Sequence, residues 1–216
     1  MFKRLLFLFT PIIVTTVLSA QTSELNMFGF CGYTGGMMVH SGYLCSNVFS
    51  IYNKNGILLG EQQIKNAPFG IGGIIRFHFG TEKNQLRIGV EGYTSTVKYY
   101  PVNSYEKMGW GGILLDYKHN GKNCVNPFVG ATLGGGGLKN HTYLEVTGND
   151  YIIEEYASFR KYSFFCISPF AGLEIAVSKK MLLIFKGDYL INISNRQNDF
   201  AEGIRIYAGI IFNRSD

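Results

Sequence analysis

Apolar and other side chains alternate at every second residue over much of this chain, and this period constrains its fold most strongly. The alternation is clearest in four segments: 85–94, 165–177, 181–191 and 204–212. In 181–191, Lys186 and Asp188 fall on one face, and the other face carries no charged residue. A period of two is typical of β-strands, and here it predicts strands with one apolar face and one mixed face.

Segments with strand character recur along most of the sequence, separated by turn-forming stretches. The predicted strands are 27–42, 68–79, 85–100, 105–118, 125–139, 162–177, 181–194 and 203–213. Short polar connections (81–84, 120–123, 178–180) alternate with longer ones (43–67, 101–104, 140–161, 195–202). This rhythm predicts an all-β fold, an eight-stranded antiparallel up-and-down transmembrane β-barrel, with both termini at the end that carries the short turns.

The first twenty residues have the composition of a targeting segment. Lys3 and Arg4 precede an apolar core, which runs from Leu5 to Leu18 and ends at the small pair Ser19-Ala20. We expect residues 1–20 to be a cleaved signal peptide and 21–216 to form the barrel. An N-terminal membrane anchor is the alternative, but the apolar core is short for a span of about 20 residues.

Composition and charge favour a membrane location over a soluble one. Charged residues make up 16% of the chain, below the ~25% of typical soluble domains. No mature segment has ~18 consecutive apolar residues, so a closed sheet is the form that satisfies the backbone in lipid. Without Lys3 and Arg4, 18 basic residues face 15 acidic ones, and a net charge of +3 argues against a nucleic-acid partner. The predicted location is the bacterial outer membrane.

Aromatic residues cluster near both predicted rims. Those near the long loops are Tyr99, Tyr100, Tyr105, Tyr151, Tyr156, Phe159 and Tyr162, and those near the short turns are Phe77, Phe79, Tyr117 and Phe212. Two such clusters are expected at the two interfaces of a membrane barrel. A soluble lipocalin-like barrel would instead turn the apolar faces inward, and its mixed faces (Ile74, Leu182) would then be unusually apolar for a wet surface.

Charged residues on the mixed faces predict an interior polar network. Its members are Arg76, Arg87, Glu91, Glu174, Lys186, Asp188 and Arg205. Hairpin register places Arg76 diagonally near Glu91, and Glu174 opposite or diagonal to Lys186, where opposite charges can pair. We interpret the network as a structural filling of the lumen, because eight strands leave room only for side chains. A gate for ions or small solutes is the functional alternative.

Three residue patterns resemble small outer-membrane β-barrel proteins of the Bacteroidetes type, related in form to the eight-stranded barrel of outer membrane protein A. A Pro-Phe-x-Gly unit occurs at 127–130 and 169–172, with a displaced variant at 68–72; the segment 170–189 resembles a penultimate hairpin, and 204–212 an assembly-signal strand. The resemblance implies recognition by the barrel-assembly machinery, although this chain continues past Phe212. Pro169 lies inside a strand and predicts a bulge.

Residues that could carry chemistry do not form a recognised motif. The cysteines (Cys31, Cys45, Cys124, Cys166) are widely spaced; Cys31 and Cys45 are the pair nearest in sequence if a disulfide forms, but small wall residues are the favoured interpretation. His40-Ser41 and His141-Thr142 lack a supporting carboxylate. We expect no enzyme, metal or cofactor.

The predicted function is a structural or surface-interaction role, carried by the loops 43–67 and 140–161. Alternatives are a narrow conduit or binding site for a small apolar solute, a lipid-modifying enzyme, and a soluble lipocalin-like binder. The expected partners are outer-membrane lipid, the assembly machinery and an unidentified extracellular molecule.

Overall fold

The computed structural model describes residues 29–81, 83–99, 104–121, 124–143, 157–178 and 180–214. The predicted signal peptide lies outside these residues, as do Tyr100, Tyr151 and Tyr156. Within the described ranges, no helix is long and apolar enough to cross a membrane.

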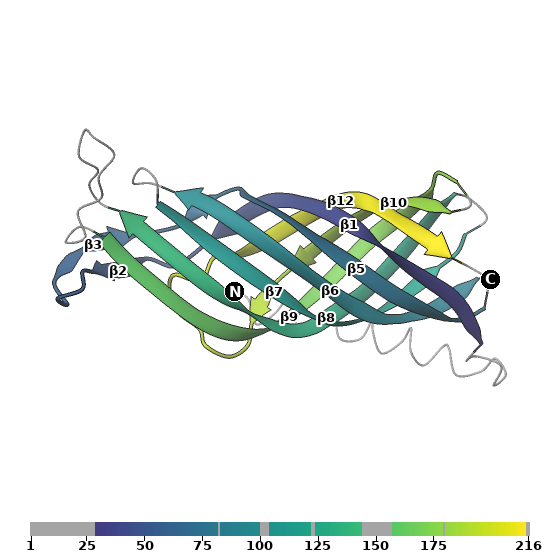
Figure 1. The fold of residues 1–216 in the computed structure, drawn as a ribbon, viewed down its shortest axis with the longest axis horizontal. Coiled ribbons are helices and arrows are strands. Elements are labelled where there is room, and N and C mark those ends of the chain that lie inside the picture. The colour runs from purple at the N-terminus through teal and green to yellow at the C-terminus, as the bar shows by residue number, and fades with distance from the viewer. Residues whose placement is uncertain are drawn as a thin grey trace, which may run out of the picture.

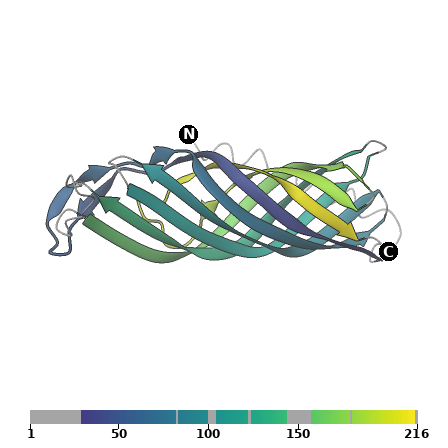
Figure 2. The same ribbon diagram turned by 45° about the horizontal axis from the view of Figure 1, so that its top comes forward.

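The strands close into a barrel in which each one pairs antiparallel with the next (Figures 1 and 2). They are β1 (Phe30–Cys45), β5 (Pro68–Gly80), β6 (Asn84–Tyr99), β7 (Ser104–His119), β8 (Val125–Tyr143), β9 (Ala157–Ala176), β10 (Met181–Tyr189) continued by β11 (Ile191–Asn192), and β12 (Glu202–Arg214). Pairing of β12 with β1 closes the ring, for example Met37 with Ile210. The predicted eight-stranded antiparallel up-and-down fold is confirmed.

The barrel has two different ends. At one, the turn end, the strands finish at Gly80, His119 and Ala176, and short connections join them. At the other, the loop end, a hairpin of β2 (Phe49–Tyr52) and β3 (Leu58–Gln62) extends the wall, and β4 (Lys65–Asn66) pairs with β1. Figure 1 shows this hairpin at the opposite end of the barrel from the C-terminus. The segment 43–67, expected to be a loop, thus contains three short strands.

Alternation along each strand separates an apolar outer face from a closed interior. On β10, Phe185 is 44% exposed while Lys186 is 1% exposed; on β12, Ile210 is 45% exposed while Arg205 is 0% exposed. Apolar side chains at every second position form a continuous outer belt, which is compatible with lipid tails and would be costly in water. The soluble lipocalin-like alternative is therefore wrong, because it requires the opposite orientation.

One expectation about a single residue is wrong, and one open alternative, a Cys31–Cys45 disulfide, is excluded. Pro169 forms no bulge: it continues the β8–β9 register opposite Ala131, one residue beyond the last β9–β10 pair, Phe170 with Asp188. Cys31 and Cys45 occupy opposite ends of β1, about 45 Å apart at ~3.3 Å per residue, far beyond the ~7 Å limit for a disulfide. All four cysteines are free.

The Pro-Phe-x-Gly units of β8 and β9 interlock inside the barrel. Phe128 lies opposite Gly172, and Phe170 lies opposite Gly130. A side chain at Gly172 would collide with the Phe128 ring and with the Phe185 carbonyl oxygen. Glycine is therefore required in this unit because the neighbouring aromatic ring covers its backbone. The variant at 68–72 does not follow this pattern, since Phe69 is 69% exposed on the outer face.

The prediction of two outward-facing aromatic clusters, one at each rim, is correct in part. Phe77, Tyr117 and Phe212 are exposed on the outer face near the turn end, and Phe159 is exposed near the loop end. Tyr99 is instead buried and bonded inside the barrel, and the hydroxyl of Tyr162 likewise bonds an interior carboxylate. Both residues share strand parity with interior positions, so strand geometry overrides the proximity to a loop that suggested a rim.

Candidate functional site: the lumen and its loop-end mouth

A layer of charged side chains closes the lumen near the turn end. Arg76 (β5) and Arg87 (β6) both bind Glu174 on β9, with nitrogen–oxygen distances of 2.5 and 2.7 Å. Lys118 (β7) binds the second carboxylate oxygen of Glu174 at 3.0 Å. Asp116 accepts from Arg76 at 3.2 Å and also from Arg87. Three cations thus share two carboxylates, and four strands are tied together across the interior.

An aromatic ring adds to this layer around Glu174, called the Glu174 layer below. The guanidinium carbons of Arg76 and Arg87 lie 5.5 and 5.1 Å from the centroid of the Phe128 ring. His78 and Thr34 add a hydrogen bond of 2.9 Å beside the charged groups. Cation–π contacts and charge-assisted hydrogen bonds are strongest where water is excluded, so these contacts stabilise the paired charges inside the barrel.

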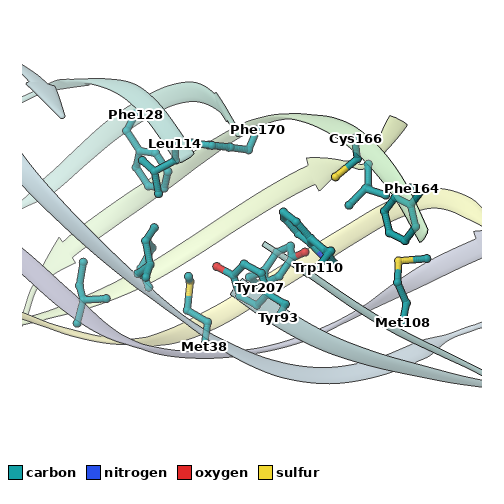
Figure 3. Close-up of a cluster of buried hydrophobic side chains, with 14 of the residues drawn as sticks. Met38, Tyr93, Met108, Trp110, Leu114, Phe128, Phe164, Cys166, Phe170 and Tyr207 are labelled. Carbon is teal, nitrogen blue, oxygen red and sulfur yellow. The ribbon is translucent and has the colours of Figure 1, made fainter. Parts of the chain in front are cut away.

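A second layer crosses the middle of the lumen around Lys186. Its ammonium binds Glu91 at 2.7 Å and lies 4.4 Å from the ring centroid of Tyr207 and 4.9 Å from those of Tyr93 and Phe170. Figure 3 shows Tyr93, Tyr207 and Trp110 grouped inside the barrel. The Lys186 side chain, its Glu91 partner and the three surrounding rings together occupy the middle of the barrel interior.

The predicted charge pairs have the expected register but different partners. Arg76 lies opposite Gly89, which is two residues from Glu91, so Arg76 and Glu91 are diagonal neighbours. Lys186 lies opposite Gly172, which is two residues from Glu174, so Lys186 and Glu174 are also diagonal neighbours. Arg76 nevertheless pairs with Asp116 and Glu174, and Lys186 pairs with Glu91. The reason is reach: the long cationic side chains cross the narrow lumen to strands that are not their neighbours.

Five of the seven predicted interior residues belong to the two ion-paired layers, and two do not. All seven are buried. Asp188 accepts hydrogen bonds from Ser168 at 3.0 Å and Tyr207 at 2.9 Å. Arg205 contacts the Met108 sulfur at 3.7 Å and makes no ion pair with a described residue. Asp188 and Arg205 therefore lie outside the two ion-paired layers.

Several interior residues were not predicted from the sequence. Asp116 and Lys118 complete the Glu174 layer. Both alternate with the outward-facing Leu115 and Tyr117, and this alternation could have predicted that they face the interior. Asp199 lies in the connection between β11 and β12, where no periodicity applies, so its burial could not be read from the pattern.

The loop-end mouth is closed by the connection between β11 and β12. Phe200 packs edge-on against Phe164, with ring centroids 5.0 Å apart, and Asp199 pairs with Arg160 at 3.3 Å. Tyr162 donates to Asp199 at 3.2 Å. Burial raises the pKa of the Asp199 carboxyl, and the nearby Arg160 guanidinium opposes this shift. This connection is thus a fixed cap and not a free loop.

An open cleft lies above this cap, outside the barrel mouth. Its volume is about 450 Å³, and Phe49 and Tyr52 of the β2–β3 hairpin form one wall. Ser158, Phe159 and Arg160 of β9 form another, and Gln197 and Asn198 form the floor. Mixed aromatic and polar walls suit binding of a ligand that has both apolar and hydrogen-bonding parts.

The two histidine–hydroxyl pairs noted in the sequence do not form catalytic pairs. Ser41 donates to the Pro68 carbonyl, while His40 faces the lumen beside Tyr207, with ring centroids 4.8 Å apart. His141 stacks on Tyr105 at 4.8 Å, while Thr142 bonds Tyr99 inside the barrel. In both pairs, adjacent residues point to opposite faces, which is what a β-strand imposes.

The fold and its interior define a class: an eight-stranded transmembrane β-barrel whose lumen is filled by side chains. Solved structures share this fold. Neisserial surface protein A (NspA) superimposes with a TM-score of 0.53 at 15% identity, over 86% of this chain and 99% of that one. Ail, the attachment invasion locus protein of Yersinia pestis, superimposes with a TM-score of 0.50 at 10% identity, over 85% and 99%. No known family matches the sequence, and no curated protein matches it.

Proposed function

We propose that this protein is a closed, non-enzymatic β-barrel of the bacterial outer membrane that acts through its loop end, which faces the exterior. The observation that carries this proposal is the closure of the lumen at three heights: the Glu174 layer, the Lys186 layer and the Asp199 cap. A barrel closed in this way supports neither solute flow nor an interior ligand. The projecting hairpin and the cleft beside it then remain as the surface available for interaction.

The outer belt and the shared fold support this placement. Apolar side chains such as Ile113 (65% exposed) and Phe165 (67% exposed) are stable on a surface of this extent only in contact with lipid. Proteins with this fold include one called a surface protein and one called an attachment invasion locus protein. Cleavage after residue 20, assembly through the terminal strand and kinship with Bacteroidetes-type barrels are part of the same proposal.

Conductance in planar bilayers tests the closed lumen. We expect the purified protein to give no steady channel. Replacing Glu174 and Lys186 together by alanine removes the centres of two layers, and this double variant should give small, frequent openings if it stays folded. Steady conductance by the unmodified protein would favour the narrow conduit instead.

Epitope insertion tests the orientation. An epitope after Asn55, at the tip of the β2–β3 hairpin, should be detected on intact cells. The same epitope after Gly121, at the turn end, should be detected only after the outer membrane is permeabilised. The reverse result, or recovery of the protein in a soluble fraction, contradicts the proposal.

A further inference from the structure

Three lysines lie side by side on the outer face of the barrel near its loop end. Lys107 (β7) pairs in register with Lys139 (β8), which pairs in register with Lys161 (β9). All three are exposed, and none forms an ion pair with a carboxylate of the described residues. Side chains directly opposite on neighbouring strands have Cβ atoms about 5 Å apart, and like charges at this spacing destabilise a sheet. An anion bound across the row would remove this cost.

The row lies at the height expected for the upper boundary of the membrane. Ten residues separate Tyr117, in the rim near the turn end, from Lys107 on β7. At ~3.4 Å per residue and ~40° of tilt they span about 26 Å, close to the ~25 Å apolar band of outer-membrane barrels. Just beyond the lysines, Tyr105, His141 and Phe159 form an aromatic row, with ring centroids 4.8 and 5.1 Å apart.

A mainly apolar hollow lies on the turn-end side of the lysine row and spans β6 to β9. Its volume is about 640 Å³, and Val90, Ile113, Leu133, Gly135, Phe165 and Ile193 line it. Gly135 and Phe165 each lie four residues from a lysine of the row, toward the turn end. Between the hollow and the lysines, the outward positions of β7 and β8 are Gly109 and Gly137, which lie opposite each other in register. No side chain on these two strands separates the charged row from the hollow.

The opposite side of the barrel has no such arrangement. The outward positions near the loop ends of β12, β1 and β5 carry Glu202, Tyr43 and Phe69. The asymmetry argues against a general basic rim.

We propose that Lys107, Lys139 and Lys161, with the apolar hollow below them, bind a phosphorylated lipid of the outer leaflet. The lysines contact its phosphates, and an acyl chain passes over Gly109 and Gly137 into the hollow. This inference rests on the proposed membrane placement and orientation, but its test uses purified protein, and failure of the placement would appear separately in the epitope experiment.

Native mass spectrometry of the detergent-solubilised protein tests the charged part. The probe is a diphosphorylated, acylated glucosamine disaccharide, with its dephosphorylated form as comparison. K107Q/K139Q/K161Q removes all three charges that contact the phosphates, so it should lower affinity for the phosphorylated probe at least about tenfold. The matched triple K65Q/K83Q/K180Q removes the same charge elsewhere and should change affinity less than about twofold. Equal losses in the two triples, or equal binding of both probes by the unmodified protein, would overturn the proposal.

A second pair of variants tests the path of the acyl chain. A Cβ at Gly109 meets no atom within 4 Å, and one at Gly137 meets only the Tyr162 carbonyl oxygen at 3.8 Å, so G109L/G137L should fold. G187L is the control, because Gly187 lies on the outer face of β10 with its nearest atom at 3.9 Å. Retention of the bound probe should fall in G109L/G137L and not in G187L. Unchanged retention in both variants would contradict the assigned path.

Discussion

Replacing Glu174 by glutamine should destabilise the barrel more than any other single removal of a charge. Glu174 is fully buried and pairs with three cations, at 2.5 Å from Arg76, 2.7 Å from Arg87 and 3.0 Å from Lys118. Glutamine keeps the shape and loses the charge. Asp116 then remains as the carboxylate facing three buried cations in this layer.

The magnitude follows from the unpaired charges that the substitution leaves. Removing one partner of a buried ion pair typically costs ~3–5 kcal/mol, because the other charge stays desolvated. All three cations lose an ion pair; Lys118 then has no ion pair with a described residue, while Arg76 and Arg87 keep Asp116. We therefore expect a loss in the free energy of unfolding near the upper end, about 5 kcal/mol. With a urea dependence of ~1–3 kcal/mol per molar, the unfolding midpoint should fall by roughly 2 M or more.

Urea unfolding in lipid vesicles, followed by the heat-modifiable shift on a gel, measures this effect. The matched control is Glu61→Gln in the exposed β2–β3 hairpin, which should change the midpoint little. A loss below about 1 kcal/mol for Glu174→Gln would refute the reasoning. It would mean that the three cations find other partners or water, and that the Glu174 layer is not held together by these ion pairs.

Three further predictions concern a wall glycine, the interior hydrogen bonds of Tyr99 and the thiols. Gly172→Ala should cost about 1–3 kcal/mol in unfolding free energy because the new methyl group meets the Phe128 ring, whereas Gly187→Ala should be close to neutral. Tyr99→Phe removes the hydroxyl that bonds Asn140 and Thr142 of β8, so it should cost about 1–3 kcal/mol and speed proteolysis at the loop end. Tyr43→Phe, on the exposed outer face, is the control, and equal effects would argue against these interior hydrogen bonds. Thiol titration of the unreduced, denatured protein should count four free thiols, and a count of two would show a disulfide that the structure lacks.

The order of the strands and the division of each strand into two faces followed from local pattern. Strand parity is a property of a few consecutive residues, so it placed Phe185 and Lys186, or Ile210 and Arg205, on opposite faces. Which face points outward followed from the mixed faces, which are too apolar for a wet surface. Strand ends were less predictable. β8 and β9 extend to Tyr143 and from Ala157, beyond the expected 139 and 162, because the two strands support each other past the point where either shows a clear pattern.

The sequence by itself determined that the chain forms a closed sheet with an apolar outside, since a period of two and an excess of apolar surface leave few other stable arrangements. The tertiary structure alone decided which charges meet. Closure of the ring brings β5, β6 and β7 within reach of β9, so Glu174 binds Arg76, Arg87 and Lys118 in place of its near neighbour Lys186. It also aligned Lys107, Lys139 and Lys161. Such register depends on how strands distant in sequence slide past one another, and no local pattern contains that information.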